Sequence, residues 1–111
     1  RFSVASGDGS SISGGYENVA SGDYSSVSGG FFNTTEYNFS SISGGSHNVA
    51  SGQYSSIMGG FRNVASGEGS TIAGGADNLA SGVGSSISGD IFKTADQTWC
   101  LLGDTLVVCP E

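Results

Sequence analysis

The sequence has little of what most globular cores and most active sites require. Only 36% of its 111 residues are hydrophobic, and its single proline is Pro110. No apolar run exceeds a few residues, which excludes a membrane span of about 20 apolar residues. The sequence has one histidine and two cysteines, and the cysteines lack a CxxC spacing. We therefore expect neither a zinc site nor a redox motif of the usual kinds.

Basic residues are equally scarce. Arg1, Arg62 and Lys93 stand against ten acidic residues, so the formal net charge is −7. Nucleic-acid-binding domains neutralise phosphates with clustered lysine and arginine, and we therefore expect no nucleic-acid partner. The 20 glycines and the abundant serine would by themselves suit a flexible linker. The order of the residues excludes that interpretation.

What the sequence does have is a regular 15-residue repeat. Each row reads approximately N-V-A-S-G-x-Y/G-S-S-I-S-G-G-x-x, as in residues 48–62. Fifteen residues are too few for a helical hairpin, but they suffice for two short strands joined by tight glycine turns. We therefore predict an all-β solenoid, a β-roll of about seven coils over residues 1–92, followed by a C-terminal capping coil over residues 93–111.

Alternation along the second short strand of each coil predicts the core. One residue per coil points inward, and its neighbours point outward. This core column comprises Ile12, Val27, Ile42, Ile57, Ile72, Ile87 and Leu102. In the first strand, alternation leaves open whether the valine column (Val4, Val19, Val49) or the alanines that follow it face inward. A single coil buries too little apolar surface to fold alone, so stability must come from stacking.

The C-terminal segment and two asparagines favour an extracellular location. Cys100 and Cys109 are the only cysteines, and we expect them to form a disulfide that pins the cap. Asn33 and Asn38 both lie in N-x-[ST] sequons and are candidate N-glycosylation sites.

Aromatic residues gather in the second to fourth coils. Their columns predict a contact patch for a glycan, a partner chain or a neighbouring protomer, and plain stacking within the roll is the alternative. The patch comprises Tyr16, Tyr24, Phe31, Phe32, Tyr37, Phe39, Tyr54 and Phe61.

Nothing in the sequence indicates catalysis. His47 has no distinguishable nucleophile to activate among the many serines. The acidic positions Asp8, Asp23 and Glu68 share a column, but they lack the G-G-x-G-x-D pattern of calcium-binding rolls. We therefore expect no enzyme activity, no cofactor and no metal.

A second interpretation comes from the serines that flank the core column. Outward S-I-S pairs recur on successive coils, and such flat hydroxyl arrays resemble the ice-binding faces of some antifreeze solenoids. The pairs are Ser11 with Ser13, Ser26 with Ser28, Ser41 with Ser43, and Ser86 with Ser88, while Met58 and Ala73 interrupt the array. A monomeric ice-binding solenoid is accordingly the alternative function.

The stretches SSISGGYENVASGDYSSVSGG and SSISGGSHNVASGQYSSIMGG resemble the left-handed β-roll of YadA-like heads in trimeric autotransporter adhesins. The resemblance covers residues 3 to about 90. It implies a parallel homotrimer that projects from a surface and binds host or matrix molecules, and phage and viral fibres use similar repeats. Our first expectation is thus an extracellular structural or adhesive protomer that self-associates as a homotrimer or a head-to-tail filament, with glycans or matrix as further partners.

Overall fold

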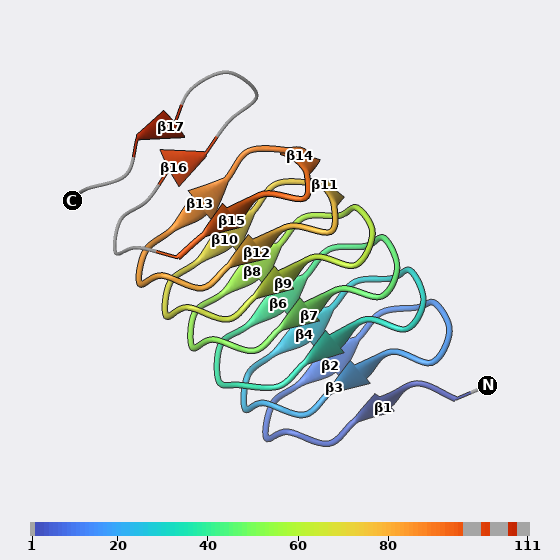
Figure 1. The fold of residues 1–111 in the computed structure, drawn as a ribbon. Helices are drawn as coiled ribbons and strands as arrows, with labels where there is room; N and C mark the ends of the chain where they lie inside the picture. Colours follow the sequence, from blue (N-terminus) through green and yellow to red (C-terminus); the bar gives the residue numbers. More distant parts are fainter. Residues whose placement is uncertain (1, 97–100, 103–106, 109–111) are drawn as a thin grey trace.

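The computed structural model describes residues 2–96, 101–102 and 107–108. All regular structure in this part of the chain consists of two-residue β-strands, stacked as a flattened roll with principal extents of 41 × 22 × 13 Å (Figure 1). This confirms the predicted β-solenoid with a 15-residue period. Since none of these residues is helical, the described chain has no helix long and apolar enough to cross a membrane.

Two sheets form the broad faces of the roll, and all their strands pair in parallel except the last strand of the second sheet. The first sheet contains, in order, β1 (Val4–Ala5), β3 (Val19–Ala20), β5 (Thr34–Thr35), β7 (Val49–Ala50), β9 (Val64–Ala65), β12 (Leu79–Ala80) and β15 (Thr94–Ala95). The second contains β2 (Ser11–Ile12), β4 (Ser26–Val27), β6 (Ser41–Ile42), β8 (Ser56–Ile57), β10 (Thr71–Ile72), β13 (Ser86–Ile87), β16 (Leu101–Leu102) and β17 (Val107–Val108). The seven strands of the first sheet are therefore joined by six full turns.

Every described coil pairs in register with the next. Val49, for example, lies opposite Val64, and Ile57 lies opposite Ile72. A separate two-stranded sheet, β11 (Gly75–Ala76) with β14 (Asp90–Ile91), continues a line of single parallel bridges along one edge of the roll. Because the spacing is constant, like residues stack on like residues along the whole roll.

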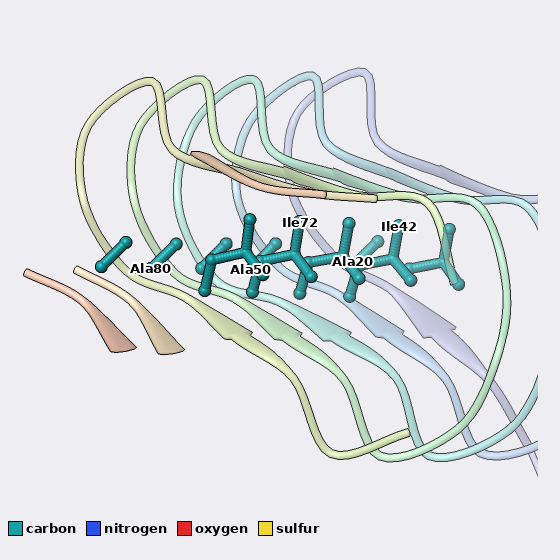
Figure 2. Close-up of a cluster of buried hydrophobic side chains, with 10 residues drawn as sticks. Ala20, Ile42, Ala50, Ile72 and Ala80 are labelled. Atoms are coloured by element: carbon teal, nitrogen blue, oxygen red, sulfur yellow. The ribbon is translucent and has the colours of Figure 1, made fainter. Parts of the chain in front are cut away.

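The core is a double row of small and branched side chains (Figure 2). The predicted isoleucine column is confirmed: Ile42, Ile57 and Ile72 are at most 1% exposed, whereas Ile12 of the first coil is only partly buried. Leu102 takes the same register opposite Ile87, but its side chain lies outside the described part. In the first sheet the alanines from Ala20 onward face inward and are fully buried, which decides the question that alternation left open, whereas Ala5 of the first coil is exposed.

A buried asparagine ladder runs beside this core. The side-chain Oδ1 of Asn33 accepts a hydrogen bond from the backbone N–H of Asn48 at 3.0 Å, and its Nδ2 donates to the carbonyls of Gly29 and Gly45. The equivalent Oδ1 bond recurs from Asn18 onward through each later coil. These amides satisfy backbone groups where the chain turns, as buried polar groups must be satisfied.

Two turns close each coil at opposite edges of the roll (Figure 1). The first turn joins the first-sheet strand to the second-sheet strand, and the second turn leads on to the next coil. Both require a residue with positive φ, which glycine supplies at Gly9 and Gly69, but Tyr54 adopts the same conformation with φ 61°. The repeat therefore tolerates a large side chain at this point of the first turn.

The stack continues beyond the boundary expected at residue 92. Strand β15 pairs with β12 in parallel, and Ala95 is fully buried like the alanines before it. Strand β16 also pairs in parallel with β13, whereas β17 pairs antiparallel with β16. Cys100 and Cys109, the expected disulfide pair, lie outside the described residues.

Candidate binding surfaces

The described residues contain no group of three or more histidine, cysteine, aspartate or glutamate side chains placed to hold a metal ion. His47 lies among aromatic rings: it stacks on Phe32 at a centroid distance of 5.0 Å, and it forms edge-to-face pairs with Phe31 and Phe61 at centroid distances of 5.7 and 5.6 Å. His47 therefore has the surroundings of a side chain packed among phenylalanine rings at the surface.

The structure divides the predicted aromatic patch into two groups, so the expectation of one continuous patch is wrong. Tyr24, Phe39 and Tyr54 lie on the first turn, with Tyr37 nearby in sequence, and the others lie on the second turn at the opposite edge. The two groups separate because they occupy columns eight residues apart in a 15-residue coil, which is half a turn of the roll.

The second-turn cluster comprises Tyr16, Phe31, Phe32, His47 and Phe61. Its rings meet mostly edge to face, for example Tyr16 with Phe32 at 5.8 Å and 88°. Arg62 extends the cluster, since its guanidinium lies 4.9 Å from the centroid of the Phe61 ring. The same guanidinium pairs with Asp77, with Nε 3.0 Å from a carboxylate oxygen. Sequence analysis missed His47 and Arg62 here, although both belong to the column that contains Phe32.

The first-turn ladder comprises Tyr24, Phe39 and Tyr54. Its rings stack nearly parallel, with centroids 5.4 and 5.1 Å apart and interplanar angles of 12° and 8°. All three side chains are exposed, Tyr54 by 56%. The spacing follows from the rise between coils, because one ring per coil in an in-register parallel ladder must repeat at about 4.8 Å. The ladder is a regular aromatic surface at one edge of the roll.

Two hollows adjoin the C-terminal end of this ladder. One, of about 380 Å³, is lined by Tyr54, Glu68, Gly69, Val83 and Gly84. The other, of about 330 Å³, is lined by Tyr37, Ser51, Gly52, Gln53, Ser66 and Glu68. Glu68 belongs to both. The first hollow could have been predicted from the sequence, because the aromatic column of the first turn changes to glycine at positions 69 and 84 and no side chain fills the space.

The two broad faces differ in chemistry. The first sheet points a mainly aliphatic column outward, half-buried in most coils: Val4, Val19, Thr34, Val49, Val64, Leu79 and Thr94. The second sheet points hydroxyl groups outward on both sides of the isoleucine column, and Ser13, Ser28 and Ser43 are exposed. Met58 and Ala73 interrupt this hydroxyl array, as the sequence indicates.

The two sequons have different environments. Asn33 is fully buried and its Nδ2 donates hydrogen bonds to two glycine carbonyls, so a glycan on that nitrogen is incompatible with the fold. The prediction of Asn33 as a glycosylation site is therefore wrong, because this asparagine belongs to the buried ladder. Asn38 lies half-buried on the first turn, where its Oδ1 accepts from the backbone of Asp23. Glycosylation at Asn38 stays a prediction.

No known protein-family model matches the chain, and no curated protein matches its sequence.

Proposed function

We propose that this chain is a non-catalytic structural and adhesive β-roll, a protomer of an extracellular fibre or surface adhesin that self-associates side by side. The observation that carries the proposal is the outward aliphatic column of the first sheet. The small inward residues of this sheet fill the core, and the repeat keeps Val49, Val64 and Leu79 in line on the outside. An apolar stripe on a straight, flat face is typical of a surface that packs against a partner.

The dimensions of the roll support this mode of association. The two longer principal extents of the molecule are 41 and 22 Å, so a broad side of it is comparable to the area of about 800 Å² that each partner buries in a stable interface. The resemblance of residues 3 to about 90 to YadA-like heads supports a homotrimer in particular. Since each chain has a net charge of −7, added salt should strengthen the association by screening repulsion between protomers.

Native mass by light scattering, combined with negative-stain imaging of the same sample, tests the proposal. We expect trimers or filaments, with larger species at higher ionic strength. Replacing Val49 and Val64 together by lysine should produce monomers, because two charges would interrupt the aliphatic stripe. The matched control replaces Ser41 and Ser56 by lysine on the opposite face and should leave the native mass unchanged. A wild-type chain that stays monomeric at high micromolar concentration would overturn the proposal.

The hydroxyl face of the second sheet favours a second candidate function, which is ice binding by a monomer. Ser26, Ser41 and Ser56 lie in one register along β4, β6 and β8, and the parallel ladder spaces them by about 4.8 Å. A regular array of this kind presents hydroxyl groups in a lattice. An ice-growth assay on the monomeric chain tests it: faceted crystals would support ice binding, and crystals shaped as in buffer alone would exclude it.

A further inference from the structure

The first-turn ladder ends in a free ring face. Along the column of positive-φ residues the order is glycine, three aromatic residues, then glycine at positions 69 and 84. At its N-terminal end Tyr24 lies over Gly9, since a Cβ atom on Gly9 would be only 2.7 Å from Cδ1 of Tyr24. At the other end no ring follows Tyr54, and the hollow of about 380 Å³ opens above Gly69.

We propose that this hollow binds a neutral pyranose unit of the glucose configuration, stacked on Tyr54 as the next ring of the ladder. This deepens the adhesive function proposed above by naming the ligand class of one edge of the roll. A glucose-type pyranose has an apolar face of C–H bonds and a rim of equatorial hydroxyl groups. The hollow offers the matching surfaces, with the faces of Tyr54 and Val83 as apolar walls and the Glu68 carboxylate as an acceptor for hydroxyl donors.

The charges around the hollow favour a neutral sugar over an anionic one. Glu68 lines it directly, and the chain carries a net charge of −7. Neither Arg62 nor Lys93 belongs to the first turn, and Arg62 is engaged by Asp77 on the second. Nucleotides, sulfated sugars and uronates would bring a negative charge next to Glu68 without a cation to compensate it.

The neighbouring hollow extends the site to a short oligosaccharide. It shares Glu68 with the first hollow and adds Tyr37 and Gln53, the first an exposed aromatic side chain and the second an amide that both donates and accepts hydrogen bonds. Position 37 carries glycine in the other coils, so Tyr37 is a departure of the third coil. A trisaccharide should therefore bind more tightly than a single methyl glucoside.

Comparison of Gly69 with Tyr54, which holds the same position in the preceding coil, suggests a substitution that would fill the site. Gly69 has φ 69°, close to the 61° of Tyr54, and a Cβ atom built on Gly69 meets nothing nearer than Gly84 Cα at 4.0 Å. The backbone at Gly69 thus already has the conformation that carries an aromatic ring elsewhere in the column. Gly69→Tyr should extend the ladder by one ring and close the hollow while preserving the fold.

Nuclear magnetic resonance titration of the full chain with cellotriose and with chitotriose tests the inference. We expect saturable shifts centred on the Gly69 and Gly84 amides, with a Kd of about 1 mM. Tyr54→Ala should weaken binding about tenfold, and Gly69→Tyr should abolish it. Tyr24→Ala, at the covered end of the same ladder, is the control and should leave binding unchanged.

Three results would overturn the inference: no shifts with either trisaccharide, shifts that persist in Gly69→Tyr, or preferential binding of a heparin-derived oligosaccharide. Retention of the wild-type amide spectrum outside the first turn shows that each variant is folded. The native mass of Tyr54→Ala and Gly69→Tyr should equal that of the wild type, because the first turn is distinct from the aliphatic stripe. A failure of sugar binding is thereby distinguishable from a failure of self-association.

Discussion

The Oδ1 of Asn48 accepts a hydrogen bond from the backbone N–H of Asn63, 15 residues later, at 3.0 Å. The Nδ2 of Asn48 donates to the carbonyls of Gly44 and Gly60, so one side chain joins its own coil to the next. All of this occurs at a residue that is fully buried. The asparagine column is therefore a structural element that a parallel sheet alone would not provide.

Replacing Asn48 by alanine should lower the free energy of unfolding by about 2 to 4 kcal/mol, because it removes three hydrogen bonds and leaves buried backbone groups unsatisfied. Urea denaturation measures the change. Asn38→Ala is the control of the same chemical type, since the half-buried side chain of Asn38 accepts a hydrogen bond from the backbone N–H of Asp23 in an exposed turn. Equal losses in the two variants would contradict a special role for the buried ladder.

The two glycines of the second turn should respond differently to the same substitution. Gly45 has φ 83°, and an added Cβ would clash with the Gly60 carbonyl and lie 2.7 Å from Nδ2 of Asn48. Gly44 has ordinary φ, and an added Cβ would meet nothing within 4 Å. We expect Gly45→Ala to destabilise by about 2 kcal/mol or more and Gly44→Ala to change stability by less than about 0.5 kcal/mol. Thermal denaturation of the two variants measures the difference, and similar midpoint temperatures would contradict the steric argument.

The fold could be predicted from the sequence because every coil repeats the same pattern of inward, outward and turn residues. The 15-residue period and its glycine pairs determine coil length, and alternation around Ile42 identifies an inward residue in every second-sheet strand. In the first sheet alternation fails, because Val49 and Ala50 are adjacent apolar residues and either could face inward. The thinness of the roll decides it: opposite the inward isoleucines the first sheet places a small residue, alanine in most coils and threonine at Thr35.

The candidate site was less predictable for a geometric reason. From the sequence alone, the two aromatic columns are expected to form one patch. In the fold they lie on opposite edges, because Phe31 is in the turn before β5 and Phe39 is in the turn after it. Asn33 matches a sequon, but only the three-dimensional register shows that its amide is buried. Local motifs do not predict burial or the position of a residue around the coil, because both depend on which residues of neighbouring coils come into contact.

Exchanging sizes within the first sheet tests the explanation for the alanines. Ala50→Val should destabilise the roll by about 1 to 3 kcal/mol, because two extra methyl groups must fit directly beside the buried side chain of Thr35. Val49→Thr is the control on the outward column, which already contains Thr34, and should cost less than about 0.5 kcal/mol. If Ala50→Val were tolerated and Val49→Thr were not, the orientation of the first sheet would have to be reversed.

Serines in one buried column differ in their hydrogen bonds, and this gives a prediction about polar groups in the interior. Ser25 Oγ donates to the Gly22 carbonyl at 2.6 Å, whereas the equally buried Oγ of Ser70 has no hydrogen-bond partner among the described residues. A buried hydroxyl without a partner loses its hydration and gains nothing in return. Ser70→Ala should therefore be neutral or stabilising, and Ser25→Ala should destabilise by about 1 kcal/mol. Urea midpoints measured at unchanged m-value test the difference, and a larger loss for Ser70→Ala would mean that its hydroxyl has a partner in solution, such as a bound water.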